Sequence, residues 1–207
     1  KRYFEYLASC PSPSTILALK AADQLMCIRE LRLVSPGSKK VVVVRDGRDA
    51  ALSAIAFARL MDKWQAPWAP KKREYLEILN AWAMRVAFLS EESSYGDLLI
   101  IRYEDLKRNF SAACESLFYQ LGLPTSTEAI ERIRLNTDFT VVSGGRKPGE
   151  TAEHIVRSGI VGEWKWELSD LEKTLAWKLA SSELELLGYS KGGCVEDWTD
   201  YVKTHLS

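Results

Sequence analysis

The chain has 207 residues, of which 46% are hydrophobic and 27% are charged, as is typical of a soluble globular protein. Its 28 basic and 28 acidic residues give a formal net charge of zero. Proteins that bind nucleic acid normally carry a basic excess, so this balance argues against a nucleic-acid partner and requires any anion site to be local. No apolar run of about 18 residues occurs, so no transmembrane segment is expected.

The first half of the chain shows strand and helix patterns in alternation. Thr15 to Leu19 (TILAL) is a weak strand candidate, because alanine and leucine also suit helices. Lys40 to Arg45 (KVVVVR) is continuously apolar rather than alternating, which is typical of a central strand buried on both faces of a parallel sheet. Helical patterns follow at Ala50 to Leu60, in a helix expected to begin near Arg48, and at Arg73 to Glu91.

The second half continues this alternation. Leu98 to Arg102 (LLIIR) repeats the pattern of a buried strand, and Ser111 to Leu121 is a helix followed by a glycine and a proline, which stop helices. A last helix is predicted from Leu168 to Leu187, with Ser169 as its N-cap and Glu172 completing a capping box.

Strands that alternate with helices predict an α/β fold, in which a central parallel sheet lies between two layers of helices as a three-layer sandwich. The sequence contains no internal repeat and no low-complexity tract, so residues 1–207 are expected to form a single domain. Lys1 is not an initiator methionine, and we expect the domain to be incomplete at its N-terminus.

The cysteines are widely separated, at Cys10, Cys27, Cys114 and Cys194, and none of them belongs to a C-x-x-C pair. Neither a zinc site nor a dense disulfide framework is therefore expected, and no metal cofactor is predicted. We interpret the cysteines as buried free thiols.

The segment from Lys40 to Ser53 (KVVVVRDGRDAALS) is the first of three candidate anion-binding elements. Ligands of α/β sheets lie outside the carboxyl ends of the strands, where helix N-termini attract anions. The guanidinium of Arg45 and the hydroxyl of Ser53 suit a phosphate. Alternatively, Arg45 pairs with Asp46 or Asp49 and has only a structural role.

The second element, Ile101 to Leu106 (IRYEDL), directly follows the other buried strand. Tyr103 could stack on a purine or form a hydrogen bond with it at this edge of the sheet. Alternatively, Tyr103 simply covers the edge.

The third element is Arg157 to Lys165 (RSGIVGEWK). Its glycines, Gly159 and Gly162, allow positive φ angles or a close approach of the backbone to a ligand. Arg157 and the hydroxyl of the next residue could grip a phosphate. The alternative is a glycine-bearing loop that is anchored by a buried tryptophan.

Taken in this order, the three elements resemble the sulfotransferase superfamily. The similarity lies in a strand that ends in arginine with a serine eight residues later, then R-Y-E-D-L after a strand, then R-x-G-x-x-G-x-W-K, and it extends roughly from Thr15 to Tyr189. It implies a P-loop NTPase-like fold and a transferase that moves a sulfuryl group from 3′-phosphoadenosine-5′-phosphosulfate (PAPS) to a hydroxyl or amine acceptor. The product is adenosine 3′,5′-bisphosphate (PAP).

The resemblance also implies which residues bind the nucleotide. The 3′-phosphate would be bound by Arg45, Ser53, Arg157, Ser158 and Gly159, and the adenine would be contacted by Tyr103. Gly47 departs from the R-x-P-R-D form of the first motif, and we interpret it as making the same turn with a looser backbone.

A larger departure concerns the family's phosphosulfate-binding loop, with its P-x-S-G-[ST]-[ST] pattern. Neither this loop nor the Walker pattern is found in the sequence, so the fold is expected to lack its first strand and loop. We therefore expect the 207 residues by themselves to transfer no sulfuryl group. The alternative to an active transferase is a non-catalytic nucleotide-binding or scaffolding module with the same fold.

Two regions are candidates for chemistry and for acceptor binding. Lys20 matches the lysine of the family's K-T-H segment and could stabilise the leaving group, or it could only cap a strand, and no general base is assigned. Trp64 and Trp68 could stack on a sugar or an apolar acceptor, or they could belong to a capped loop.

The partners implied are a small-molecule or carbohydrate acceptor, together with a possible second copy of the chain in a homodimer. The expected location is the cytoplasm, with the Golgi lumen as the alternative. The glycosylation sequon at Asn109 to Ser111 does not decide between these compartments.

Overall fold

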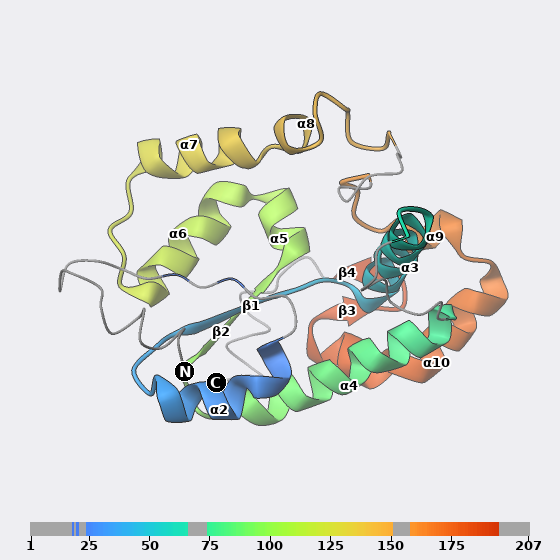
Figure 1. Cartoon of the computed structure of the whole chain (residues 1–207), viewed down its shortest axis with the longest axis horizontal. Helices are drawn as coiled ribbons and strands as arrows, with labels where there is room; N and C mark the ends of the chain where they lie inside the picture. Colours follow the sequence, from blue (N-terminus) through green and yellow to red (C-terminus); the bar gives the residue numbers. More distant parts are fainter. Residues whose placement is uncertain (1–17, 19, 21–23, 66–73, 151–157, 195–207) are drawn as a thin grey trace.

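A computed structural model describes residues 18, 20, 24–65, 74–150 and 158–194 of the chain (Figure 1). The elements in chain order are η1 (Gln24–Cys27), α2 (Ile28–Val34), β1 (Lys40–Val44), α3 (Gly47–Lys63), α4 (Tyr75–Ser93), β2 (Leu98–Arg102), α5 (Tyr103–Arg108), α6 (Phe110–Leu121), α7 (Thr127–Thr137), α8 (Phe139–Val142), α9 (Trp164–Glu167), α10 (Asp170–Leu186), β3 (Tyr189–Ser190) and β4 (Gly193–Cys194).

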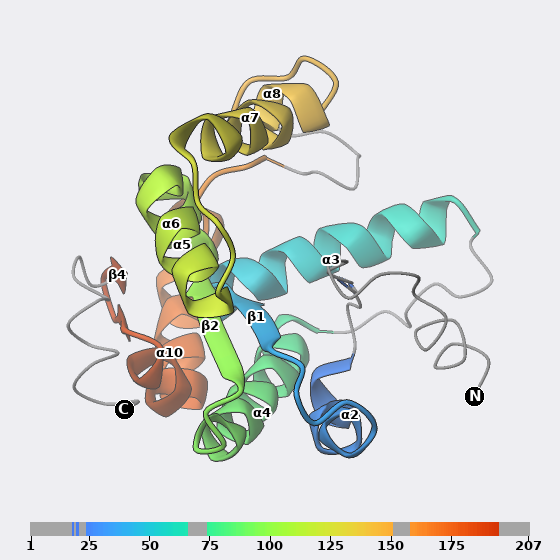
Figure 2. The same ribbon diagram turned by 90° about the vertical axis from the view of Figure 1, so that its left-hand side faces the viewer.

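The sheet is parallel and lies between two layers of helices. β1 pairs with β2 along its whole length, from Lys40 opposite Leu98 to Val44 opposite Arg102. Helices α2, α4 and α10 lie on one side of the sheet, and α5 and α6 lie on the other side, with α7 farther out (Figures 1 and 2). The predicted α/β architecture and both strands are confirmed. The short pair β3 and β4 is antiparallel and follows α10.

One prediction about β1 is wrong, because this strand is not buried on both faces. Val42 and Val44 face the core, whereas Val41 and Val43 expose 40% and 57% of their surface. Helix α6 contacts β2 on that side of the sheet. Among the described residues, the second face of β1 is therefore left open.

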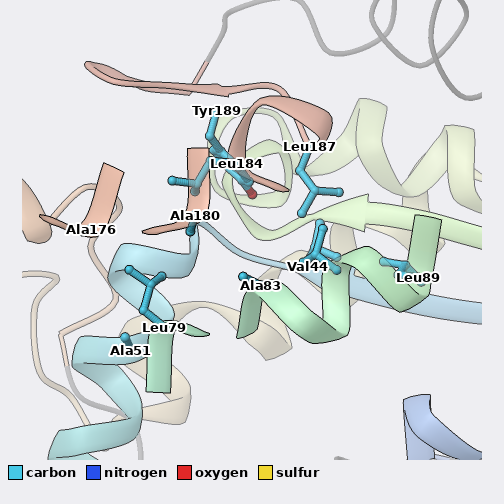
Figure 3. Packing of buried hydrophobic residues seen from close by; sticks show 11 residues of the cluster. Val44, Ala51, Leu79, Ala83, Leu89, Ala176, Ala180, Leu184, Leu187 and Tyr189 are labelled. Carbon is cyan, nitrogen blue, oxygen red and sulfur yellow. The ribbon is translucent and has the colours of Figure 1, made fainter. Parts of the chain in front are cut away.

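The hydrophobic core lies between the sheet and helices α3, α4 and α10 (Figure 3). Small residues stand where these helices meet, since Ala51, Ala176 and Ala180 are fully buried. Leu79 and Leu184 fill the space between them and are also fully buried. Alanine lets helix backbones approach closely, and the leucines bring most of the apolar area that burial removes from water.

Local capping signals fix the helix ends as the sequence predicts. Ser169 and Glu172 form the expected capping box of α10, with the Ser169 amide donating to the Glu172 carboxylate at 2.8 Å. Helix α3 begins at Gly47, close to the predicted start near Arg48, and the Asp46 carboxylate caps it by accepting a hydrogen bond from the backbone N–H of Arg48 at 3.0 Å.

The remaining predictions concern the first strand candidate, the cysteines and the other helices. The weak strand candidate at Thr15 to Leu19 lies largely outside the described residues. Cys114 is a buried free thiol as expected, but Cys27 is exposed, so burial is wrong for this residue. Helices α2 and α7 were not anticipated. None of the helices in the described ranges is long and apolar enough to cross a membrane.

A cluster of charges joins α2 and α4 to the start of β1. Glu92 accepts hydrogen bonds from Arg29 and Arg32. Asp97 accepts from Arg32 Nε at 2.9 Å and from Lys40 Nζ at 2.7 Å. Chiefly because of the hydrogen bonds from Arg32, the pKa of Asp97 lies well below its ordinary value.

Replacing Asp97 with asparagine (D97N) is expected to lower the free energy of unfolding by about 1 kcal/mol at neutral pH. The pKa of Asp97 in the folded chain is lower than its ordinary value of 3.8, so its stabilising effect is complete above that value and is lost as the pH falls below it. The difference between the parent and D97N should therefore narrow below about pH 4. Urea unfolding over a pH series measures this difference, and one that does not change with pH would contradict the assignment.

Candidate functional site

A cavity of about 730 Å³ opens beyond the carboxyl ends of β1 and β2. Its lining comes from β1 and α3, from α5 to α8, and from the segment after residue 157. The residues that line it are Val43, Arg45, Ser53, Tyr103, Leu106, Lys107, Arg108, Phe110, Arg134, Thr137, Asp138, Phe139, Val142, Ser158, Gly159 and Glu163.

All of the predicted nucleotide-binding residues that the structure describes line this one cavity. They are Arg45, Ser53, Tyr103, Ser158 and Gly159. Arg157 lies outside the described residues. The convergence of the first two motifs follows from the topology, because parallel strands end at the same edge of their sheet.

Arg45 is held at the cavity by contacts with three segments. Its Nη2 donates to the carbonyl of Ile160 at 2.8 Å and lies 3.5 Å from the Asp49 carboxylate. Its guanidinium carbon lies 4.9 Å from the centre of the Tyr103 ring. Arg45 therefore pairs with Asp49, as the structural interpretation proposed, and lines the cavity as well.

The Nε atom of Arg45 is buried and has no hydrogen-bond partner. Every other buried side-chain nitrogen or oxygen in the described ranges has a partner. A buried donor without an acceptor is costly, by about 1–3 kcal/mol. An anion in the cavity could supply the missing acceptor. The hydroxyl of Ser53, which lies in α3 and lines the same cavity, could be a second donor.

The segment after residue 157 reaches the cavity through a turn that requires glycine. Gly159 has a φ of +69°, and a Cβ atom there would lie 2.3 Å from Cδ2 of Phe139. The positive φ is as predicted, and the close neighbour of the glycine is the ring of Phe139. Ser158 is buried and its carbonyl accepts from the backbone N–H of Gly149 at 2.9 Å.

Phe139 lines the cavity and was not predicted from the sequence. It is buried at the start of α8, and its ring is flanked by two cations, with Lys107 Nζ 6.0 Å and the guanidinium carbon of Arg146 5.4 Å from the ring centre. An aromatic ring in such a wall can stack on a purine. Nothing local distinguishes Phe139 in the sequence, because its position depends on contact with Gly159.

Arg48 is fully buried behind the cavity and ties the start of α3 to two later segments. Its guanidinium forms two bonds with the Asp46 carboxylate, at 2.9 and 2.7 Å, and donates to the carbonyl of Ser190 at 3.0 Å. It also stacks 3.7 Å from the ring centre of Trp164. The charge is thus paired, as burial requires.

Glu104 joins the end of β2 to β3 and α3. Its carboxylate accepts from the Tyr189 hydroxyl at 2.7 Å and from the backbone N–H of Asp46 at 3.0 Å. Burial raises the pKa of both Glu104 and Tyr189. Next to it, Arg102 is fully buried and forms two bonds of 2.8 Å with Asp105.

Asp49 joins α3 to the segment that carries Ser158 and Gly159. It is 1% exposed, and its two oxygens accept from the backbone N–H groups of Gly162 at 2.6 Å and Trp164 at 3.0 Å. Burial raises the pKa of Asp49, although the two backbone bonds oppose this shift. From the sequence, Asp49 was predicted only as a possible partner of Arg45.

Neither Lys20, predicted for catalysis, nor Trp64, predicted for acceptor binding, is brought to the cavity. Lys20 is exposed and is not among the lining residues. Trp64 caps the end of α3 opposite the cavity and is 54% exposed. Trp68 lies outside the described residues. The roles assigned to these side chains remain predictions.

Comparisons with known proteins agree with this geometry. Residues 1–127 match the model of the Sulfotransferase family. The chain belongs to this family.

Two curated relatives show how much of a sulfotransferase the chain represents. Human sulfotransferase 6B1 is 24% identical over 184 residues, which cover 82% of this chain and 57% of the relative. Mouse sulfotransferase 1B1 is 28% identical over 144 residues, covering 61% of this chain and 48% of the relative. The chain thus spans about half the length of the curated relatives it matches.

Solved structures show the same fold. Mouse sulfotransferase SULT7A1 complexed with PAP superposes with a TM-score of 0.57 at 18% identity, over 71% of this chain and 58% of that one. Retinol dehydratase in complex with androsterone and the inactive cofactor PAP gives 0.52 at 20% identity, over 87% and 56%. The predicted sulfotransferase fold is confirmed.

Gly47 does more than loosen a turn. It is the buried first residue of α3, and a Cβ atom there would lie 2.4 Å from Cε3 of Trp82. The indole ring fills the space that a larger residue would need. Close packing therefore requires glycine here, which corrects our interpretation of a looser backbone.

The substitution Gly47→Ala is expected to lower the free energy of unfolding by about 1–3 kcal/mol, because the new methyl group overlaps the ring of Trp82. The matched control is Gly37→Ala, where a Cβ atom meets nothing within 4 Å. The control should change stability by only about 0.5–1 kcal/mol. Urea unfolding of both variants measures the contrast, and equal stabilities would contradict the packing argument.

Proposed function

We propose that the chain binds PAP and PAPS in the cavity at the carboxyl ends of β1 and β2, as the nucleotide site of a PAPS-dependent sulfotransferase. The observation that carries this proposal is the convergence of Arg45, Ser53, Ser158 and Gly159 on one cavity, with a buried donor of Arg45 left unbonded. It is supported by the related folds of SULT7A1 and retinol dehydratase, which hold PAP in their solved structures.

The charges around the cavity suit an anionic nucleotide. Positive lining side chains are Arg45, Lys107, Arg108 and Arg134, and negative ones are Asp138 and Glu163. The chain as a whole is neutral, so this local excess answers the requirement that the anion site be local.

The cavity lining also divides into a part for phosphate and a part for the base. Arg45 and Ser53 would donate to the 3′-phosphate, where hydrogen bonds to a charged acceptor are strong. Tyr103 and Phe139 would offer aromatic surfaces to the adenine. Arg45 belongs to both parts, since it lies against the Tyr103 ring.

When bound, PAPS supplies the sulfuryl group. The acceptor oxygen would form a bond to sulfur while the bond from sulfur to the phosphate oxygen breaks and leaves its electron pair on PAP. The proton of the acceptor would pass to a base. The residues of this chain would hold and orient the nucleotide through its distant 3′-phosphate. We propose a small-molecule hydroxyl acceptor, because retinol dehydratase has been solved with androsterone and with retinol.

Calorimetric titration of the chain tests the nucleotide assignment. PAP should bind at least about tenfold more tightly than adenosine 5′-monophosphate, because only PAP places a phosphate at Arg45 and Ser53. Arg45→Ala should remove most of this preference, and it should change the affinity for adenosine 5′-monophosphate little. The matched control is Arg85→Ala, an exposed position on α4 that does not line the cavity.

Two outcomes of the titration would contradict the assignment. One is equal affinity of the parent for both nucleotides, and the other is an unchanged preference in Arg45→Ala. Arg157→Ala in the same series extends the test to a residue that the structure does not describe.

Sulfuryl transfer is tested separately, by the release of PAP from PAPS in the presence of a panel of phenols, sterols and sugars. We expect nucleotide binding without turnover, because the pattern of the phosphosulfate-binding loop, P-x-S-G-[ST]-[ST], is not found in the 207 residues. Measurable turnover would assign the complete reaction to these 207 residues.

A further inference from the structure

Asp49 connects the two halves of the candidate phosphate site. One half is the end of β1 and the start of α3, with Arg45 and Ser53, and the other is the turn that begins at Ser158. Asp49 belongs to the first half, but both of its oxygens accept backbone N–H groups of the second half, at Gly162 and Trp164. Because Asp49 is 1% exposed, water cannot replace these bonds.

Arg45 and Asp49 each bind the turn and also lie next to each other. Arg45 Nη2 donates to the carbonyl of Ile160, Asp49 accepts from the amide of Gly162, and the two side chains lie 3.5 Å apart. Gly162 has a φ of +82°, a conformation that glycine adopts without strain. The position of the Ser158 to Gly162 turn and the orientation of the Arg45 guanidinium therefore depend on the same carboxylate.

Asp49 has two opposite influences on a bound anion. Its negative charge attracts the guanidinium of Arg45 and would weaken the attraction of that arginine for a phosphate. Its hydrogen bonds keep Arg45 and the turn in place to receive the phosphate. The ion-pair distance of 3.5 Å is long and Arg45 is 23% exposed, whereas both backbone bonds are short and buried. Positioning should therefore outweigh the electrostatic effect.

We propose that Asp49 is a positioning residue that sets the selectivity of the site for 3′-phosphorylated nucleotides. This proposal rests on the proposed function. Without the carboxylate, the turn would separate from α3 and Arg45 would lose its fixed partner at Ile160. The contact of Tyr103 with the adenine would remain, because Tyr103 belongs to α5 and not to the turn. The loss should therefore fall on the 3′-phosphate and not on nucleotide binding in general.

Calorimetry with Asp49→Asn measures this selectivity as the ratio of the affinities for PAP and for adenosine 5′-monophosphate. We expect the ratio to fall by about tenfold or more, with the affinity for the monophosphate changed by less than about threefold. D97N serves as the control, because Asp97 binds Arg32 and Lys40 at the other end of β1. Its ratio should stay within about twofold of the parent value.

The outcomes separate the two levels of the proposal. A parent chain that does not prefer PAP overturns the proposed function and this inference with it. A parent that prefers PAP, together with an unchanged or increased ratio in Asp49→Asn, overturns only the positioning role. An increased ratio would show that the charge of Asp49 acts mainly against the phosphate. Equal losses for both nucleotides would also overturn it, because they would indicate a general structural effect.

Hydrogen exchange of the parent chain keeps the inference testable if Asp49→Asn does not fold. The backbone amides of Gly162 and Trp164 should exchange slowly without nucleotide, at rates comparable with amides inside α3. Exchange at the rate of exposed loop amides would show that the turn is not held, and this result would overturn the proposal.

Discussion

Three buried carboxylates, those of Asp46, Asp49 and Glu104, hold the segments that meet at the ends of β1 and β2. Asp49 accepts from the backbone at Gly162, and Glu104 accepts from the hydroxyl of Tyr189. Removing a carboxylate from water is costly, and complete hydrogen bonding is needed to offset that cost. The segments bonded to these groups are therefore fixed in position relative to the sheet edge, and the cavity exists because they are fixed.

Under the proposed function, this arrangement would let a chain with no net charge offer a local anion site. The arginines near the sheet edge differ sharply in their pairing. Arg48 and Arg102 are fully buried and bonded to carboxylates, so their charges are neutralised by partners within the fold. Arg45 keeps a long ion pair and an unbonded Nε at the cavity. Arg48 and Arg102 are therefore paired within the fold, whereas Arg45 lines the cavity.

Features set by neighbouring residues could be predicted from the sequence, and features set by distant contacts could not. The capping box of Ser169 and Glu172 and both parallel strands depend on local pattern, and both are confirmed. The exposure of Val43 depends on where α6 packs, and the role of Phe139 depends on a glycine that is distant in sequence. Nor could a single sequence show that Asp49 bonds to the backbone of the late turn. The motifs could be recognised in the sequence, but the hydrogen bonds that join them could not be predicted from it.

A crystal structure of the chain with bound PAP would show directly which side chains hold the 3′-phosphate. We expect the 3′-phosphate to lie within hydrogen-bond distance of the Arg45 guanidinium and the Ser53 hydroxyl, with Asp49 still bonded to the turn. A 3′-phosphate near Lys107 and Arg134, with the Nε of Arg45 still unbonded, would overturn the proposed site.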